Sequence, residues 1–433
     1  MSLLIRNGRV IDPANGLDGP GDVLIRDGVV SAVGPRLEVA QETTVVDVGG
    51  RVVAPGFIDM HVHLREPGYE YKETVATGTR AAAAGGFTAV ACMANTRPVN
   101  DTRAVTDYIL AEARVRGLVR VYPIGAVTRG LAGAELAEMG ELAEAGCVAY
   151  SDDGRPVVSA ALLRRALLYA QTFGRPVISH AEDDTLSHDG AMHEGFVATE
   201  LGLRGIPAAA EEIMVARDIA LAELTGTPVH IAHVSTAAAV RLLRDAKARG
   251  VPVTGEVTPH HLLLTDEAMR AYDANAKMAP PLRGKRDVEA CREALADGTL
   301  DALATDHAPH AVSDKEVELD RAANGVVGLE TAVALCLTHL VRARVLDLPT
   351  LIARLTVGPA RVLGLPGGRL SPGAPGDVTV LDLDRTHQID PTHFHSKGRN
   401  TPFGGWACVG GPWLTVVGGR VVMREGVLAS GPA

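Results

Sequence analysis

Apolar segments with the length and composition of β-strands recur through the middle of the chain. Stretches rich in Ala, Leu, Glu and Arg separate them, such as ETVATGTRAAAA and SAALLRRALLYAQTFG, and these favour helices. Continuous apolar strands that alternate with helices are typical of a parallel sheet covered by helices. The segments are GFIDMHVHL (56–64), FTAVACMAN (87–95), VRVYPIGAV (119–127), GCVAYSDDG (146–154), PVISHAED (176–183), PVHIAHVS (228–235), VPVTGEVTP (251–259) and DALATDHAP (301–309).

Eight such units within about 250 residues predict an α/β fold, a closed (β/α)8 barrel of the TIM type. An open, doubly wound sheet is the alternative, but no GxGxxG motif follows any of the strands. The regular succession of eight units therefore favours a closed barrel.

Both ends of the chain have a different, β-rich pattern. LLIRNGRVID and DVLIRDGVVSAVG contain Asn-Gly and Asp-Gly, which are strong hairpin signals, and WLTVVGGRVVMREGVL near the C-terminus contains Gly-Gly. We therefore expect a small β-sandwich domain assembled from both termini. The predicted boundaries are 1–54 and 363–433 for the two parts of this β domain, and 55–362 for the barrel.

The composition is that of an ordinary soluble globular protein of 433 residues, with 46% hydrophobic and 22% charged residues. Aromatic residues make up only 3%, so the core must be built mainly from Ala, Val, Leu and Ile. The net charge of −10 is spread without a long block of one sign, which argues against a nucleic-acid-binding surface.

The cysteines and the N-terminus predict the compartment. The five cysteines form no CxxC pair and are odd in number, so a disulfide framework is not expected and a reducing, cytoplasmic location fits best. The N-terminus lacks the pattern of a signal peptide, and no apolar run approaches the roughly 18 residues of a membrane span.

Ionisable residues collect at the C-terminal ends of the predicted strands, where a β/α barrel carries its active site. They come from the first, fourth, fifth, sixth and eighth strands. These residues are His61 and His63, Asp152 and Asp153, His180, His233, and Asp306 with His307 and the later His310.

The pair His61 and His63 indicates a metal site. Residues i and i+2 of a strand share one face, so both imidazoles point into the barrel mouth, and imidazole suits zinc and other first-row metals. A single histidine at a strand end is more often structural, but four histidines and two aspartates at one barrel end predict a metal centre. His230 falls on the opposite face from His233 and is predicted to be structural, whereas His260 and His261 are ambiguous, with a structural or supporting role favoured.

Six ligands exceed the needs of one tetrahedral zinc ion. Two metal ions about 3.5–4 Å apart, sharing a bridging carboxylate, would use all six. We therefore expect one or two Zn²⁺ per subunit, with a binuclear site favoured. Such a pair activates water and polarises a carbonyl group, which is hydrolytic chemistry or its reverse.

Seven motifs together resemble the dihydroorotases of the amidohydrolase superfamily, of the bacterial type with a bridging aspartate. The resemblance spans almost the whole chain. Related hydantoinases, dihydropyrimidinases and allantoinases bridge their metals with a carboxylated lysine on the fourth strand, but residues 146–155 contain no lysine and Asp153 takes its place. The motifs are GFIDMHVHLREPG, MANTRPVND, YSDDGRPV, ISHAED, HIAHVS, TPHHLLL and ATDHAPH.

The resemblance implies metal ligands and a reaction. His61, His63 and Asp306 would hold one metal, and His180 and His233 the other, with Asp153 between them. The implied reaction is the reversible cyclisation of N-carbamoyl-L-aspartate to L-dihydroorotate in de novo pyrimidine (UMP) biosynthesis. Asp306 would be the catalytic residue that accepts a proton from the attacking water and returns it to the departing amide nitrogen.

The resemblance also implies a substrate site. Arg65 offers a bidentate fork for the substrate carboxylate. The alternative to this substrate role is a surface salt bridge with Glu66 or Glu70. The long polar connection 310–328 would add backbone contacts, since connections of that length usually carry function. The implied substrate-binding residues are His63, Arg65, Asn95, His310, Asn324 and Gly325.

One departure affects the substrate assignment. Related sequences commonly read KMNPPLR after the seventh strand, with the asparagine contacting substrate, whereas this chain reads KMAPPLR with Ala279 at that place. The contact is either missing or replaced by a neighbour such as Asn275. The metal assignment is unaffected.

Two alternatives stay open on sequence alone. The chain could be a related cyclic amidohydrolase of the hydantoinase or allantoinase type, or an inactive dihydroorotase-like subunit of an aspartate transcarbamoylase complex. Inactive subunits typically lack several metal ligands, whereas all six positions are filled here. A homodimer and a possible complex with aspartate transcarbamoylase are expectations from the family alone, and the sequence does not determine the native metal or its occupancy.

Overall fold

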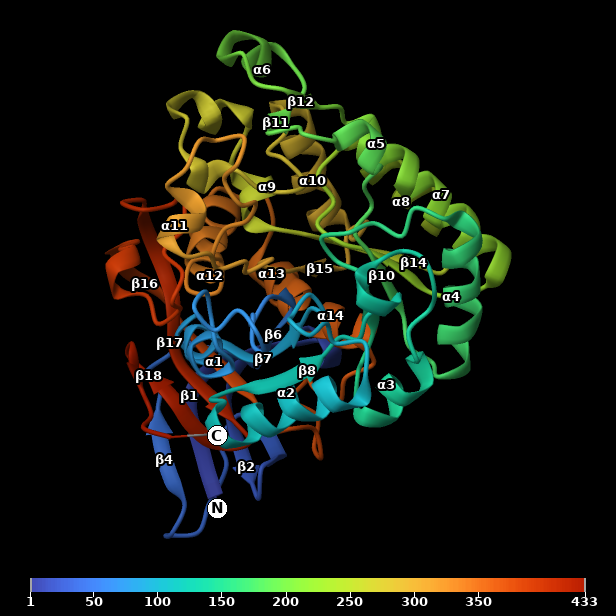
Figure 1. Ribbon diagram of the computed structural model, residues 1–433. Coiled ribbons are helices and arrows are strands. Elements are labelled where there is room, and N and C mark those ends of the chain that lie inside the picture. The colour runs from blue at the N-terminus through green and yellow to red at the C-terminus, as the bar shows by residue number, and fades with distance from the viewer. Residues whose placement is uncertain (1, 432–433) are drawn as a thin grey trace.

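The computed structural model describes residues 2–431 and has a barrel of eight parallel strands at its centre (Figure 1). Each predicted apolar segment contains one barrel strand, so all eight strand predictions are confirmed. The strands are β6 (Phe57–Val62), β7 (Phe87–Cys92), β8 (Arg120–Pro123), β9 (Tyr150–Ser151), β10 (Val177–Ser179), β13 (Val229–Ile231), β14 (Val253–Val257) and β15 (Ala302–Leu303).

Two short backbone bridges close the barrel. Regular pairing links β6–β7–β8 and β9–β10–β13–β14–β15 into two parallel sheets. At one junction the backbone N–H of Ser151 donates to Gly125 O at 2.8 Å, and at the other the N–H of His63 donates to His307 O at 2.9 Å. The fold is therefore the closed barrel, and the second junction brings His63 beside His307.

Helices cover the outside of the barrel between successive strands. Thr74 caps α1 by accepting a hydrogen bond from Thr77 N, and Ser159 caps α4 in the same way from Leu162 N. The sequence predicted both of these helices. The main covering helices are α1 (Val75–Ala84), α2 (Arg103–Arg116), α3 (Met139–Ala145), α4 (Ala160–Thr172), α7 (Ala209–Thr225), α8 (Ala237–Ala248), α10 (Lys285–Asp297), α12 (Ala332–Cys336), α13 (Leu348–Leu355) and α14 (Val357–Leu363).

Shorter elements lie in the connections. They follow β10, β14 and β15 for the most part, on the side of the barrel where the strands end. They are α5 (Asp184–Ser187), β11 (Met192–His193), α6 (Phe196–Leu201), β12 (Gly205–Ile206), α9 (Pro259–Leu263), α11 (Val312–Lys315), five 3-10 turns (Pro13–Asn15, Arg129–Leu131, Asp266–Ala271, Ala274–Ala276 and Pro391–His393) and a π-helical turn (Leu337–Val341).

The two chain ends share one sheet of nine strands, as predicted for a β domain built from both termini. Figure 1 shows the blue N-terminal and red C-terminal strands side by side, joined where β5 pairs with β16. The strands form one continuous mixed sheet, in which the turn at Gly28 lies against the turn at Gly418. The strands are β1 (Ser2–Asp12), β2 (Leu17–Arg26), β3 (Val29–Gly34), β4 (Thr44–Asp47), β5 (Val52–Pro55), β16 (Val378–Gln388), β17 (Ala407–Val417), β18 (Arg420–Arg424) and β19 (Val427–Leu428).

The buried core is aliphatic, as the composition predicts. Met60, Ile178 and several alanines fill the barrel interior, and Leu363 of α14 packs into the same cluster. All five cysteines are buried and unpaired. Among residues 2–431, none of the helices combines the length and the apolar character that a membrane span requires.

Candidate metal centre

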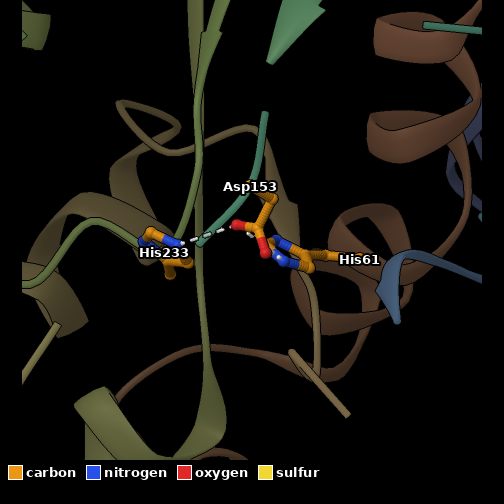
Figure 2. Close-up of side chains that lie close together, drawn as sticks. All are labelled: His61, Asp153 and His233. Atoms are coloured by element: carbon orange, nitrogen blue, oxygen red, sulfur yellow. Dashed lines mark ion pairs between the residues drawn. The ribbon is translucent and has the colours of Figure 1, made fainter. Parts of the chain in front are cut away.

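The six predicted ligand residues converge at the C-terminal end of the barrel, and all six are buried. Asp153, just after β9, lies close to all four histidines of this arrangement. Its carboxylate oxygens lie 3.3 Å from His61 Nε2 and 3.5 Å from His63 Nε2, His180 Nδ1 and His233 Nε2. Figure 2 shows the Asp153 carboxylate between the rings of His61 and His233.

Three of the residues form a compact set of ligand atoms on the β6 and β15 side. Asp306 Oδ1 lies 3.0 Å from His63 Nε2 and 3.5 Å from His61 Nε2. The ligand atoms of this trio are all within 4.8 Å of one another, as are those of His61, Asp153 and His233. The spacing fits a metal ion bound by His61, His63 and Asp306.

A second set lies beside it, on the β10 and β13 side. His180 Nδ1 is 2.9 Å from His233 Nε2, and Asp153 Oδ1 is 3.5 Å from both nitrogens. Asp153 therefore belongs to both sets, which is the position that a bridging carboxylate requires.

The Nδ1 atoms of the His61 and His63 rings, which point away from the centre, form hydrogen bonds with acceptor oxygens. His61 Nδ1 lies 2.6 Å from Glu256 Oε1, and His63 Nδ1 lies 2.9 Å from Asn95 Oδ1. Since a carboxylate or an amide oxygen can only accept, each Nδ1 carries the proton and each Nε2 lone pair faces the centre. Such outer partners are typical of metal-ligating histidines.

Orphaned polar atoms support a metal ion at this place. Within residues 2–431, His61 Nε2 and Asp153 Oδ1 are buried without a hydrogen-bond partner. Buried polar atoms are rarely left unpaired in folded proteins, and a site that binds an ion is one of the established reasons for an exception. The donor set of imidazoles and carboxylates therefore fits a transition-metal ion such as zinc.

Glu256 on β14 is a functional residue that sequence reasoning missed. Its carboxylate is fully buried, and besides His61 it contacts His230 Nε2 at 3.3 Å. His230 also pairs with Thr254 Oγ1 at 2.8 Å, which confirms its predicted structural role. The available signal was one glutamate inside the otherwise apolar segment VPVTGEVTP.

The histidines govern the charge state of the two carboxyl groups. Burial alone would raise the pKa of Asp306, but His61 and His63 outweigh it and hold this pKa well below its usual range. Burial is likewise outweighed at Asp153, where His61, His180 and His233 hold the pKa well below its ordinary value. Both carboxyl groups are therefore ionised, as candidate ligands of a cation should be.

Three residues of the site have left-handed backbone conformations. The φ angles are +62° at Arg65, +33° at His233 and +47° at Asp306. Such angles are costly for residues with a Cβ atom, and they cluster at functional sites, where the surrounding structure holds them in place. Each of the three follows a barrel strand, so the strain aims these side chains into the mouth.

A cavity of about 250 Å³ opens beside the metal centre. Every predicted substrate-binding residue lines it, together with Ala279 and Glu182. Arg65 donates from Nε to Pro309 O at 3.2 Å and makes no ion pair among residues 2–431. The alternative of a salt bridge to Glu66 or Glu70 is therefore wrong, and the charged fork of Arg65 faces the cavity.

His310 is a neutral hydrogen-bonding residue of the cavity wall. Its Nε2–H donates to Asn324 O at 2.8 Å, and its Nδ1 accepts from Lys72 Nζ at 3.3 Å. Burial and the nearby cations Arg65, Lys72 and Lys315 lower its pKa to about 2. Gly325 has φ +126° and donates its N–H to Lys277 O, so this N–H already has a partner.

The contacts of the remaining candidate residues show whether each belongs to the site. Asp152 accepts from Val127 N at 2.7 Å and from Thr128, which makes it a structural residue rather than a ligand. His261 is held by Thr258 Oγ1 at 2.8 Å and Pro280 O at 3.0 Å, as expected for a structural role. Asn275 lines a neighbouring cavity and is not among the residues around Ala279.

Comparisons with known proteins identify the family. One family model, described as dihydro-orotase-like, matches residues 50–239, and another, described as amidohydrolase family, matches residues 201–423. The dihydroorotase of Anaeromyxobacter dehalogenans strain 2CP-1 is 61% identical over 425 residues, covering 98% of each chain. The dihydroorotase of Pelotomaculum thermopropionicum is 59% identical over 428 residues, covering 99% of this chain and 100% of its own. This chain belongs to the dihydroorotase family.

Solved structures support the same assignment of fold for this member of the dihydroorotase family. The L-hydantoinase (dihydropyrimidinase) of Arthrobacter aurescens superimposes with a TM-score of 0.90 at 27% identity, covering 99% of this chain and 97% of that one. The dihydropyrimidinase of Brevibacillus agri gives a TM-score of 0.86 at 25% identity, with coverages of 100% and 96%. The parallel α/β core and the sheet built from both termini are therefore the hydantoinase-like amidohydrolase fold.

Proposed function

We propose that this chain is a metal-dependent dihydroorotase that interconverts N-carbamoyl-L-aspartate and L-dihydroorotate. The observation that carries the proposal is the Arg65 guanidinium, which makes no ion pair among residues 2–431 and lines the same cavity as five of the six proposed metal ligands. A cyclic amide that also bears a carboxylate needs both features at once. The full-length similarity to dihydroorotases supports this choice of substrate.

The metal in this proposal is zinc, in one or two sites. His61, His63 and Asp306 would hold one ion, His180 and His233 the other, and Asp153 would contact both. When bound, such ions activate water and polarise the carbonyl group of the substrate. Glu256 and Asn95 contribute by fixing the tautomers of His61 and His63, so that both Nε2 lone pairs face the ions.

Asp306 acts as the proton carrier in this proposal. Only its Oδ1 lies against the histidines, at 3.0 Å from His63 Nε2, and the residue lines the cavity. During ring opening the Asp306 carboxylate accepts the proton of the attacking water and delivers it to the departing amide nitrogen. During ring closure the same steps run in reverse: Asp306 accepts the proton that the attacking carbamoyl nitrogen loses and delivers it to the oxygen that leaves.

Arg65 and Asn95 hold the substrate carboxylate, and His310, whose Nε2–H is bonded to Asn324 O, lines the cavity wall beside them. Arg65 supplies a fork of N–H donors whose planar geometry matches a carboxylate. Asn95 uses its Oδ1 for His63 and reaches Asp153 O only at 3.4 Å, so its Nδ2 has donor capacity for the ligand. His310 stands beside Arg65, with 3.4 Å between His310 Nε2 and Arg65 Nη2.

Two other functions are less well supported. Hydrolysis of an uncharged cyclic amide would suit the solved hydantoinase and dihydropyrimidinase structures, but it would leave the buried charge of Arg65 without a partner. An inactive subunit would have no need of six converging ligand residues. A homodimer and a complex with aspartate transcarbamoylase remain predictions from the family.

The test is ring opening of L-dihydroorotate by zinc-loaded protein, followed by ultraviolet absorbance, with chelator-stripped protein as the control. The proposal expects turnover that depends on metal and is restored when zinc is added back. Dihydrouracil, hydantoin and allantoin are assayed in parallel, and preference for any of them over dihydroorotate would favour the related amidohydrolases. No turnover on any substrate by folded, zinc-loaded protein would favour the inactive subunit.

A further inference from the structure

A segment of the terminal β domain contacts three residues that line the substrate cavity, Ala308, His310 and Gly325. Residues 395–400, which we call the strap, lie between β16 and β17 and cross the barrel on the side where the strands end. Its last residue, Asn400, is almost fully buried. Nothing in the sequence pattern set this segment apart from an ordinary loop.

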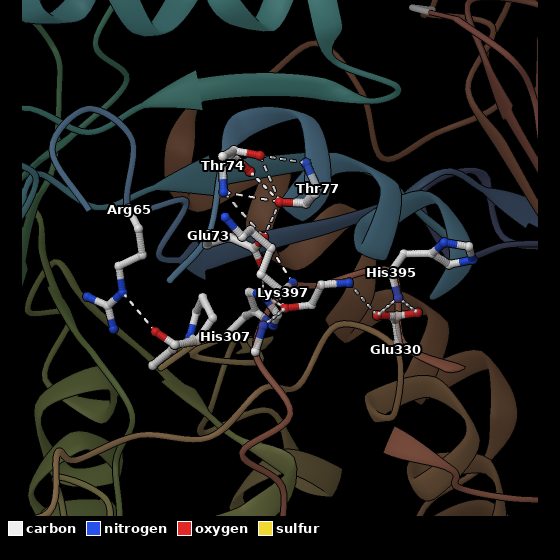
Figure 3. A network of polar contacts seen from close by, with 12 residues as sticks. Arg65, Glu73, Thr74, Thr77, His307, Glu330, His395 and Lys397 are labelled. Carbon is white, nitrogen blue, oxygen red and sulfur yellow. Dashed lines mark hydrogen bonds and ion pairs between the residues drawn. The ribbon is translucent and has the colours of Figure 1, made fainter. Parts of the chain in front are cut away.

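Two carboxylates of the barrel, the buried Glu73 and the half-buried Glu330, fix the start of the strap (Figure 3). Glu330 accepts from the backbone N–H groups of His395 at 2.9 Å and Ser396 at 3.0 Å. Glu73 accepts from the Ser396 hydroxyl and from Lys397 N at 3.2 Å, and it also contacts His307 Nε2 at 3.3 Å. The strap is therefore attached to the barrel immediately beside Asp306.

The Asn400 side chain connects two segments of the cavity wall. Its Nδ2 donates to Ala308 O at 2.9 Å and to Gly325 O at 3.0 Å. Its Oδ1 accepts from His310 N at 3.0 Å. One amide thus joins the turn after β15 to the far end of the long polar connection.

The first of these segments holds Arg65, the proposed contact of the substrate carboxylate, and the two segments are themselves linked. Arg65 Nε donates to Pro309 O. Pro309 lies between Ala308 and His310, the two residues of this turn that form hydrogen bonds with the Asn400 side chain. His310 Nε2–H is held by Asn324 O, next to Gly325. The relative placement of Arg65, His310 and the 324–325 backbone therefore depends on Asn400.

We propose that Asn400 is a positioning residue that aligns the carboxylate-binding side of the cavity. This inference rests on the proposed function, because it assumes that Arg65 binds the substrate carboxylate. Asn400 makes no hydrogen bond to any of the six ligand residues. Its loss is therefore expected to weaken substrate binding while the metal stays bound.

The variants Asn400→Ala and Asn400→Asp test this role. Alanine removes all three side-chain bonds, whereas aspartate keeps the shape and the acceptor but places an oxygen against the carbonyls of Ala308 and Gly325. Removing one partner of a buried pair leaves the other unsatisfied, so KM for L-dihydroorotate is expected to rise about tenfold or more. Zinc content should equal that of the wild type, and kcat should change less than KM.

Thr379→Val is the matched control. Thr379 is a fully buried residue of β16 in the same β domain, and its hydroxyl donates to Gly86 O at 2.7 Å and accepts from Phe57 N at 3.2 Å. These contacts also join the terminal domain to the barrel, but at the opposite ends of its strands. The control should lower the melting temperature and leave KM unchanged.

The outcomes separate this inference from the proposed function. Wild-type KM in both folded Asn400 variants, or an equal rise of KM in Thr379→Val, would overturn the positioning role. Absence of wild-type turnover would instead overturn the proposed function. In that case hydrogen exchange tests the inference, because the His310 amide should exchange faster in Asn400→Ala, which lacks the acceptor, than in Thr379→Val.

Discussion

His61 Nδ1 lies 2.6 Å from Glu256 Oε1, with both side chains fully buried, on barrel strands β6 and β14. The contact fixes the position of the Nδ1 proton and turns the opposite nitrogen, Nε2, toward Asp153 and Asp306. Burial by itself would raise the pKa of Glu256, but His61 and His230 lower it to about 2. Glu256 is therefore ionised at any working pH and orients the first histidine of the metal centre.

Glu256→Gln should weaken metal binding. The amide removes the negative charge that supports His61 and must also rearrange its contact with His230, so the affinity for zinc should fall about 10- to 100-fold. Competition against a chromophoric chelator measures this. Asp377→Asn is the control, because Asp377 is a buried carboxylate paired with Arg120 away from the centre, at 2.7 Å. Equal affinities of Glu256→Gln and wild type would refute the orienting role.

Asp306→Asn should separate metal binding from turnover. The side chain keeps its size and one oxygen, but the amide cannot carry a proton between water and the amide nitrogen. General acid–base groups contribute roughly 10²- to 10⁴-fold, so kcat should fall by that amount in both directions. Metal content and kcat are measured on the same samples, and near-normal turnover would show that Asp306 is not the proton carrier.

Arg65→Ala should act on substrate binding. Losing one partner of a buried charge pair costs about 2–5 kcal/mol, which corresponds to a rise in KM of at least about 30-fold. The melting temperature and zinc content should change little, because Arg65 has only Pro309 O and His310 as close polar partners. Steady-state kinetics with L-dihydroorotate checks this. An unchanged KM would contradict the role of Arg65 and favour an uncharged cyclic amide as the substrate.

His310 should make the protein less stable in acid. Its pKa of about 2 in the folded chain lies below the ordinary value of 6.5, so the unfolded chain binds the extra proton. Stability is therefore complete above pH 6.5 and is lost as the pH falls, by about 2 kcal/mol between pH 7.5 and 5 for this one group. Urea denaturation of His310→Gln at both pH values should show a loss smaller by that amount, whereas identical losses would contradict the assignment.

The barrel and the metal ligands could be predicted because they follow from local pattern and one rule of geometry. Apolar segments identify the strands, the two-residue period places His61 and His63 on one face, and parallel strands bring their C-terminal ends together. The choice of Asp153 over Asp152 came from the family resemblance. The contacts of Asp152 with Val127 and Thr128 supply its physical reason.

Residues that support the site through long-range contacts could not be predicted. Glu256 lies 195 positions from His61, and Asn400 lies 90 positions from His310. A buried glutamate or asparagine has no periodicity of its own, and its partner is known only when the strands are in place. Asn95 was predicted as a substrate contact, but its hydrogen bond to His63 was not foreseen.

The central claim is that this site recognises a cyclic amide by its carboxylate, and a comparison of two substrates tests it most directly. Dihydrouracil has the same ring as L-dihydroorotate without the carboxylate. The zinc-loaded protein should have a kcat/KM for L-dihydroorotate at least about 30-fold above that for dihydrouracil, and Arg65→Ala should lose most of this preference. Equal kcat/KM values for the two substrates, or a preference for dihydrouracil, would contradict the account.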